Sequence, residues 1–431
     1  MTKYRSIDAL RGFASLWVLA YHLWCAYFPT ANLQNCSPSA NLPSATELPL
    51  EVLLTMPLFG FGYAGICLFF VLSGFCIHLP QARRFQKTGH DGLDKRSFAS
   101  RRFWRLYPAF FASLFLAGLG FFAMNFCWES PPGEAGITFH YFLEATGAVW
   151  IGMNAFFLFA IKPEATIINA VYWTLWLELQ FYLFYPLLLR ACRSWGFGRI
   201  AMFLLAIELL LSLVPALVGA EKLMKPPLEW LFLCRYFEWF LGMLLAEKCA
   251  KGSFIAPRTS LIVVFAGFSG GMLLALHPIG HSIHQLVFSI GSFGVVGYFI
   301  APSLRKSESR SIHLFGWFGD YSYSLYLVQI PVMRIVYALE TQLPMSYRGY
   351  TSFYAAGAVC LVLVPVVAWC LYQLVEKRFM KGSPPRIETG AIAPVESPIE
   401  PTPDDHPTTA RMSSSVMMRY SLPSTVTSEP A

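Results

Sequence analysis

Residues 58–79 read LFGFGYAGICLFFVLSGFCIHL, a run of twenty-two residues without one Asp, Glu, Lys or Arg. A helix needs roughly 20 apolar residues to cross the hydrocarbon core of a bilayer, so this run predicts a membrane-spanning helix. Similar runs recur along the chain as far as residue 375. Of the 431 residues, 55% are hydrophobic and 13% are charged, and that charged share is about half of what soluble domains carry. The sequence therefore predicts an all-α polytopic membrane protein.

The distribution of Lys and Arg decides how many of the apolar runs cross the membrane, because cytoplasmic loops next to spans are enriched in these residues. If the apolar stretch 139–161 does not cross, the loops on the side of the N-terminus hold 22 Lys and Arg against 4 on the other side; if it crosses, the split is 14 against 12. We therefore predict about ten transmembrane helices in one bundle, with both termini cytoplasmic, in the cell or inner membrane. The ten candidate spans are residues 9–28, 58–79, 106–126, 172–192, 200–219, 230–247, 260–276, 284–302, 314–340 and 351–375.

Two segments fall outside these spans. The stretch 139–161 becomes a re-entrant or interfacial piece that protein must cover, because bare non-helical backbone is costly in lipid. Residues 382–431 contain nine Pro and fourteen Ser or Thr but few large apolar residues. Such a composition cannot bury enough surface to offset the entropy of ordering. We predict a membrane domain over residues 1–381 and a disordered cytoplasmic tail over residues 382–431.

Charge and cysteine content exclude two kinds of partner. The formal net charge is +7. In a chain of this hydropathy, an excess of Lys and Arg is expected in loops beside the spans and does not indicate nucleic-acid binding. The ten Cys are scattered and form no Cys-x-x-Cys pair. His277, His281 and His284 are spaced like metal ligands, yet no carboxylate or Cys lies near them in sequence. We predict no metal site and no nucleic-acid partner.

The first predicted span carries several ionisable residues. It reads Arg5-Ser-Ile-Asp8-Ala-Leu-Arg11-Gly12, then eight apolar or small residues, then Tyr21 and His22. Ionisable side chains inside a span are costly and usually face the bundle interior. Arg11 and His22 are separated by about three helical turns, so they share one face and lie ~16 Å apart along the axis. Two interpretations stay open: Asp8 and Arg11 form a helix-end ion pair and His22 is a core histidine, or the stripe belongs to a site.

The same residues resemble a known family. Arg5-x-x-Asp8-x-Leu10-Arg11-Gly12 followed by His22 is similar to the opening signature of the acyltransferase-3 family, which consists of polytopic membrane O-acyltransferases. Later stretches resemble further motifs of that family in the same order, over roughly residues 5–380. These stretches are FFVLSGF at 69–75, RRFWRLYP at 101–108, WTLWLELQFY at 173–182, GDYSYSLYL at 319–327 and Glu376-Lys377. One position departs from the family: Gln329 stands where members often have His, and a Gln cannot move a proton near neutral pH.

The basic segment 80–105 is a candidate donor site. It holds eight Lys or Arg, and Arg102 and Arg105 are three residues apart, so on a helix they project to one side. Planar guanidinium groups match phosphate oxygens well. From the charges alone, an anchor for anionic lipid headgroups is the better interpretation. The family resemblance implies instead that Arg101, Arg102 and Arg105 bind the phosphates of acyl-CoA.

Glu178 is a candidate partner of His22. Each lies about six residues inside the outer end of its predicted span, which places the two at similar depth. A carboxylate beside an imidazole orients the ring and stabilises the charged form that follows proton transfer. We take His22, Arg11 and Glu178 as candidate catalytic residues. The supporting candidates are Asp8, Ser73, Tyr323 and Gln329.

Topology, motifs and resemblance combine into one expected function. We expect an integral-membrane O-acyltransferase that moves an acyl group, most simply acetyl, from cytoplasmic acyl-CoA to a hydroxyl of a carbohydrate, polysaccharide or glycolipid. Burial keeps the imidazole of His22 neutral and able to accept the hydroxyl proton, while Arg11 stabilises the oxyanion. Direct transfer and an acyl-enzyme both stay open. The alternatives are a proton-coupled transporter or lipid flippase that uses the same buried charges, and a non-catalytic membrane partner.

Overall fold

The computed structural model describes residues 4–27, 50–89, 92–127, 169, 171–218, 231–277, 280–302, 309–340, 342–344, 346–347 and 350–381. Over these ranges the protein is helical and contains no strand, which confirms the predicted all-α class. The described helices belong to one compact unit, residues 2–385. The stretch 139–161 and the tail 382–431 lie outside the described residues, so the predictions made for them stay predictions.

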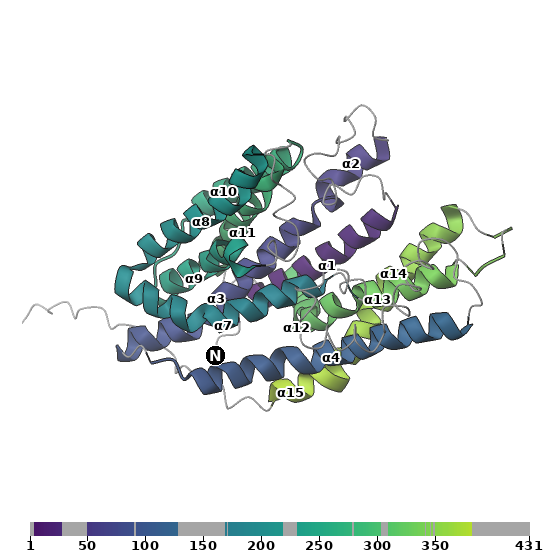
Figure 1. The fold of residues 1–431 in the computed structure, drawn as a ribbon, viewed down its shortest axis with the longest axis horizontal. Helices are drawn as coiled ribbons and strands as arrows, with labels where there is room; N and C mark the ends of the chain where they lie inside the picture. The colour runs from purple at the N-terminus through teal and green to yellow at the C-terminus, as the bar shows by residue number, and fades with distance from the viewer. Residues whose placement is uncertain are drawn as a thin grey trace, which may run out of the picture. The chain divides into compact units, whose positions relative to one another are not determined.

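The helices pack into a bundle, and α1 contacts several of the others (Figure 1). Helix α1 packs against α3, α12 and α13; α3 packs against α9, α10 against α11, and α4 against α13. The helices are α1 Arg5–Tyr27, α2 Leu50–Phe59, α3 Gly62–Thr88, α4 Lys95–Cys127, α7 Tyr172–Trp195, α8 Phe197–Leu217, α9 Tyr236–Ala250, α10 Pro257–Ala275, α11 His284–Ile300, α12 Arg310–Asp320, α13 Ser322–Glu340, α14 Tyr350–Leu371 and α15 Lys377–Lys381. Short 3₁₀ turns cover Phe232–Cys234 and Gly280–Ser282, and a π-helical turn covers Tyr372–Glu376.

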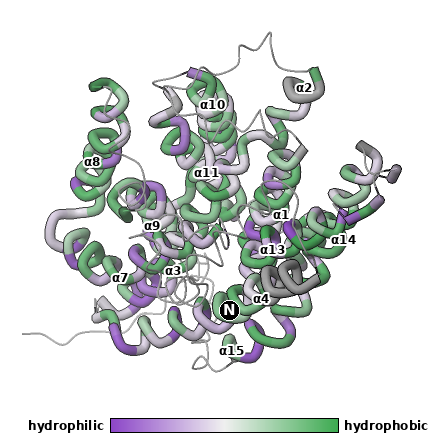
Figure 2. The backbone as a smooth tube through the Cα atoms, turned by 45° about the vertical axis from the view of Figure 1, so that its right-hand side comes forward, coloured by the Kyte–Doolittle hydropathy of each residue, from purple (hydrophilic) through white to green (hydrophobic). Residues whose placement is uncertain are grey.

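Five helical stretches within the described part of the chain are long and apolar enough to cross a membrane: 54–88, 197–217, 257–275, 322–340 and 351–380. Figure 2 shows hydrophobic residues along most helices. Large apolar side chains such as Phe203 on α8, Phe265 on α10 and Val362 on α14 are exposed. Apolar surface of this extent, spread over several helices, is expected where lipid rather than water surrounds a protein. The chain is a membrane protein.

Helices α3 and α4 extend further than the hydropathy pattern predicts. The sequence placed spans at 58–79 and 106–126 with a basic loop between them, whereas α3 continues to Thr88 and α4 begins at Lys95. Lys, Arg and Gln are good helix formers, so a helix continues after its apolar stretch ends. Helix α4 has 33 residues and is about 50 Å long. Arg101, Arg102 and Arg105 therefore project from a helix.

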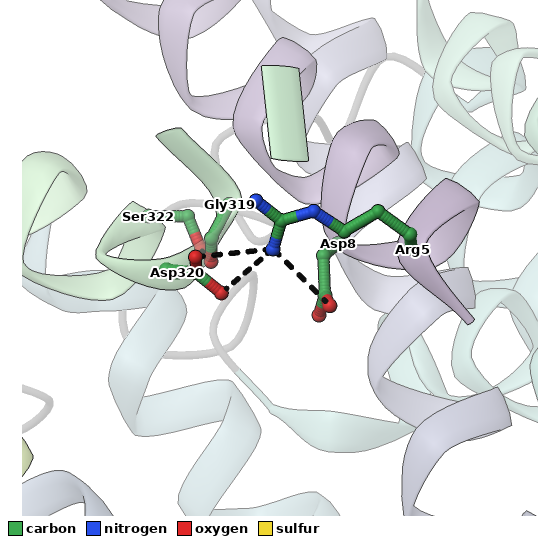
Figure 3. A network of polar contacts seen from close by, with 5 residues as sticks. All are labelled: Arg5, Asp8, Gly319, Asp320 and Ser322. Carbon is green, nitrogen blue, oxygen red and sulfur yellow. Dashed lines mark hydrogen bonds and ion pairs between the residues drawn. The ribbon is translucent and has the colours of Figure 1, made fainter. Parts of the chain in front are cut away.

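The predicted span 314–340 is two helices rather than one. Helix α12 ends at Asp320 and α13 begins at Ser322, because Tyr321 between them has φ −122° and ψ 23°, outside the helical range. The hydroxyl of Ser322 donates to the carbonyl of Gly319, 3.0 Å away, and Arg5 of α1 donates to the carboxylate of Asp320 at 3.0 Å (Figure 3). At 11 residues, α12 is about 16 Å long, too short to cross the bilayer. Only α13 of this pair has the length of a span.

Glycines permit the closest helix contacts. A Cβ on Gly74 of α3 would lie 1.9 Å from the backbone oxygen of Trp239, and a Cβ on Gly242 of α9 would lie 2.0 Å from that of Val71. Likewise, a Cβ on Gly12 would lie 2.0 Å from the backbone oxygen of Phe315 on α12. Small residues at crossings are typical of membrane helices, whose association depends on close packing. These contacts fix α3 and α1 at the centre of the bundle.

Candidate active site

Helix α1 carries both Arg11 and His22 without interruption between Arg5 and Tyr27. The regular rise therefore sets their axial separation at ~16 Å, as the sequence predicted. Phe13 is exposed, whereas Ala14, Val18 and Leu19 are buried against the rest of the bundle. Arg11 and His22 are both partly buried. One helix thus joins two polar regions at different depths.

The polar neighbour of His22 is Gln329 of α13, whose side chain interacts with the imidazole. Gln329 is 0% exposed, so the ring faces the interior rather than lipid. Nδ1 of His22 and both amide atoms of Gln329 are shielded from solvent and have no hydrogen-bond partner. The ring of Tyr21 lies against the same imidazole, with centroids 5.5 Å apart. Nearby positions on α1 and α13, among them Leu19, Leu325 and Val328, belong to one buried apolar cluster. Among the described residues, the pair is thus a polar contact in a largely apolar part of the bundle.

The basic end of the site is built on α4 and α7. The guanidinium carbon of Arg102 lies 5.5 Å from the ring centroid of Phe98 and 5.6 Å from that of Tyr182, in cation–π geometry. Nε of Arg102 is shielded and has no hydrogen-bond partner. Phe98 in turn lies against Tyr185, with ring centroids 5.3 Å apart. Aromatic rings hold this guanidinium in place while leaving hydrogen-bonding capacity for a ligand.

Glu178 accepts hydrogen bonds from two hydroxyl groups, and a third helix supports one of these donors. The hydroxyl of Ser73 on α3 donates to Oε1 of Glu178 at 3.1 Å, and the hydroxyl of Tyr182 donates to the same oxygen. The indole of Trp239 on α9 donates to Oγ of Ser73 at 3.2 Å. The sequence proposed Ser73 and Glu178 but not Tyr182 or Trp239. The four-residue spacing of Glu178 and Tyr182 was a readable signal, since such residues are neighbours on a helix face.

Three arginines converge around one thiol. Arg11 of α1 and Arg102 and Arg105 of α4 all lie within electrostatic range of Cys76 on α3, and Arg105 is also within range of Glu178. Cys76 follows Ser73 by three residues and so shares its inward face, yet its side chain is exposed. Space is therefore open beside the thiol of Cys76, next to these arginines.

Glu376, in the π-helical turn that follows α14, lies near the same arginines. Its carboxylate accepts a hydrogen bond from Ser324 at 2.6 Å and lies within electrostatic range of Arg11 and Arg105. The region thus holds three carboxylates, Asp8, Glu178 and Glu376, against the guanidinium groups of Arg11, Arg102 and Arg105. The structure brings the late Ser-Tyr-Ser and Glu-Lys motifs together with the first-span Arg. More than 300 residues separate Arg11 from Ser324 and from Glu376 in the sequence.

The remaining predicted residues have structural partners. Arg101 donates to Ser97, one turn earlier on α4. Asp8 lies 4.0 Å from Arg5, which also binds Asp320 (Figure 3). The hydroxyl of Tyr323 donates to the carbonyl of Leu106 at 2.9 Å, tying α13 to α4. These contacts connect the helices around the arginine region.

His277 and His284 lie on either side of the short turn before α11. Within the described ranges, no group of three His, Cys, Asp or Glu side chains could hold an ion. His284 opens α11 and is 4% exposed, with its ring 5.8 Å from that of Phe288. His277 accepts a hydrogen bond from the backbone N–H of Gly280 at 3.3 Å. His284 is thus a buried helical residue at the start of the predicted span 284–302.

Comparison with known proteins identifies the family. Residues 4–370 match the model of the acyltransferase domain. The chain belongs to this family. The acyltransferase is 25% identical over 381 residues to the acyltransferase MdmB of Streptomyces mycarofaciens, which covers 81% of this chain and 87% of the relative. It is 24% identical over 344 residues to an O-acetyl transferase of Shigella phage Sf6, covering 77% of this chain and 89% of the relative. No solved structure matches the chain.

Family and relatives confirm the predicted activity at the level of reaction class. The acyltransferase is an enzyme that transfers acyl groups other than amino-acyl groups. The motifs that carried the resemblance lie on α1, α3, α4, α7 and α12–α13, and these helices supply the residues described above. The polar regions of the bundle interior are therefore the candidate site of acyl transfer.

Proposed function

We propose that the acyltransferase moves an acyl group, most simply acetyl, from acyl-CoA to a hydroxyl of a carbohydrate-type acceptor. The observation that carries the donor assignment is the convergence of Arg11, Arg102 and Arg105 on the open space beside Cys76. Guanidinium groups bind phosphate through charge-assisted, often bidentate hydrogen bonds. Coenzyme A carries several phosphate groups, so its charge suits three clustered arginines.

Nearby carboxylates explain how the clustered arginines can lie close together when no acyl donor is bound. Glu178 and Glu376 offset part of the positive charge, and each carboxylate is fixed by hydroxyl donors, Ser73 and Tyr182 for Glu178 and Ser324 for Glu376. A buried charge without compensation is costly. Arg101 also lies within electrostatic range of Arg102, so four guanidinium groups face the three carboxylates Asp8, Glu178 and Glu376, and an anion entering the region is attracted. Glu178 then acts at the donor end, where Ser73 and Tyr182 hold it.

His22 is the proposed catalytic base. Its imidazole lies about three turns of α1 away from Arg11, so a donor anchored by phosphate at the arginines extends along α1 toward the ring. The acceptor hydroxyl attacks the thioester carbonyl while His22 takes its proton; the C–S bond then breaks, and the proton passes to the departing thiolate. General base catalysis of this kind contributes typically 10²–10⁴-fold.

Arg11 receives a different role from the one expected from sequence. Its side chain groups with Arg105 and Glu376 rather than with His22. Side chains on a helix lean toward its N-terminus, which increases the distance from Arg11 to the imidazole. We therefore assign Arg11 to the donor phosphates and not to the oxyanion.

The membrane arrangement follows from the same assignment. We propose ten spans with both termini and the arginine end of α4 in the cytoplasm, where acyl-CoA is available. His22 then lies toward the outer half of the bundle, where a glycan or glycolipid acceptor of the cell or inner membrane can approach. The 22 to 4 distribution of Lys and Arg supports this orientation.

A reconstitution experiment tests the proposed function. The purified full chain in liposomes receives acetyl-CoA and a panel of methyl hexosides and methyl 6-deoxyhexosides; CoA release is followed by chromatography and acetylated glycosides by mass spectrometry. The proposal predicts both products, and it predicts weaker acetyl-CoA binding in R102A/R105A. Arg96, exposed on the same helix, gives the matched control R96A. Glycoside movement across the liposome without CoA release would instead identify a transporter.

A further inference from the structure

Gln329 stands out because its polar side chain is buried beside the imidazole of His22 and has no hydrogen bond to any other described residue. The residue is 0% exposed, and neither Oε1 nor Nε2 makes a hydrogen bond. Buried amides are nearly always hydrogen-bonded, because removal from water is otherwise costly. The neighbouring side chains of α1 and α13 are apolar, among them Leu19, Leu325 and Val328. The amide therefore serves His22, its polar neighbour, or a ligand that enters the site.

The number of hydrogen-bonding atoms without a partner shows that the amide of Gln329 serves both His22 and a ligand. Three shielded atoms lack partners: Nδ1 of His22 and the two amide atoms of Gln329. One hydrogen bond between the two side chains satisfies one ring nitrogen and one amide atom. The second amide atom is then left over, and no described protein group binds it. A substrate atom is the remaining candidate.

The proposed function decides which amide atom faces the ring. A neutral imidazole has one N–H and one bare nitrogen, and the bare nitrogen is the base. If His22 accepts the hydroxyl proton on one nitrogen, the other carries hydrogen and donates it to Oε1 of Gln329. Nε2 of Gln329, with its two N–H groups, is then the atom left for substrate. It donates, so its partner is an oxygen that gains negative charge.

We propose that Gln329 has two functions in acyl transfer: its Oε1 fixes the tautomer of His22, and its Nε2 donates to the carbonyl oxygen of the acyl group as the tetrahedral intermediate forms. This inference rests on the proposed function. It also explains the use of Gln at a position where the family often has His. A carboxamide supplies the N–H donor and holds the ring without adding a charge that would retain the proton on His22.

Three substitutions test this inference in the full chain, with acetyl-CoA and the methyl glycoside panel. Q329L keeps the volume but removes both polar atoms, and it lowers kcat by about 100-fold at unchanged KM for acetyl-CoA, the size of effect seen when an oxyanion donor is lost. Q329E stabilises the charged imidazole, so the acidic limb of the pH–rate profile moves up by about 1 to 2 pH units. Q329H restores an N–H donor and is faster than Q329L.

Thermal unfolding and acetyl-CoA binding of each variant separate these effects from loss of fold. If Q329L does not fold, the pH–rate profile of Q329E and the rate of Q329H test the role of Gln329 instead. Wild-type rates in Q329L, or an unshifted profile in Q329E, overturn the role of Gln329 while leaving the proposed function intact. Absence of CoA release by the wild-type protein itself is the distinct result that overturns the proposed function.

Discussion

The guanidinium carbon of Arg102 lies 5.6 Å from the ring centroid of Tyr182, and the hydroxyl of that same ring donates to Glu178. One tyrosine thus contacts a cation with its face and an anion with its edge. The arrangement fixes a positive and a negative charge beside each other on α4 and α7 without a direct ion pair between them. Arg102 stays available for a further anion.

Replacing Tyr182 separates the contribution of the ring from that of the hydroxyl. Y182F keeps the ring under Arg102, whereas Y182A removes it, and a cation–π contact contributes about 0.5–2 kcal/mol. We expect Y182A to weaken acetyl-CoA binding by roughly threefold to 30-fold more than Y182F does, in proportion to that energy. Isothermal titration of the purified protein measures both. Equal affinities for the two variants would show that the ring does not position Arg102.

The rate at which Cys76 is labelled can show whether the donor site is occupied. Its thiol is exposed and lies among Arg11, Arg102 and Arg105. Bound CoA should therefore cover it. In a variant that keeps Cys76 as its single cysteine, we predict that acetyl-CoA slows maleimide labelling of Cys76, and that R102A/R105A abolishes this protection. Labelling at the same rate with and without saturating acetyl-CoA would place the donor elsewhere.

The contact between α3 and α9 predicts a large difference between two glycine substitutions. A Cβ on Gly74 would lie 1.9 Å from the backbone oxygen of Trp239, whereas one on Gly198 of α8 would meet nothing within 4 Å. Overpacking of this kind costs about 1–3 kcal/mol. We expect G74A to lower the unfolding temperature and to reduce donor binding, because α3 also carries Ser73 and Cys76. G198A is the matched control and should unfold at the wild-type temperature or above it; similar temperatures for both variants would contradict the close contact.

The sequence was sufficient where a single helix determines the geometry. Arg11 and His22 were placed on one face of one helix from their spacing alone, and α1 is continuous through both. The motif residues Ser73 and Glu178 were also identified, and they bind each other. Local spacing and family motifs were enough for these because neither depends on how distant segments pack.

Features that depend on tertiary contacts were not predictable. The break at Tyr321 lies inside the single predicted span 314–340, and it accompanies the contact of Arg5 with Asp320, residues far apart in sequence. Equal depth in two predicted spans suggested Glu178 as the neighbour of His22, but depth does not specify which faces meet. Across helices, Glu178 contacts Ser73 and His22 contacts Gln329, whereas Tyr182 contacts Glu178 within α7. Hydropathy also ended α3 too early, because charged residues can continue a helix beyond the apolar stretch.

Acetyl transfer by H22A is the measurement that tests the central claim most directly. The wild-type protein and H22A are first loaded with acetyl-CoA to equal occupancy, which shows that the arginine region of the variant is intact. The transfer of acetyl to a methyl glycoside is then followed in a single turnover. Our account predicts that H22A binds donor normally but transfers acetyl at least about 100-fold more slowly, as expected for loss of a general base. A single-turnover rate equal to that of the wild-type protein would contradict it.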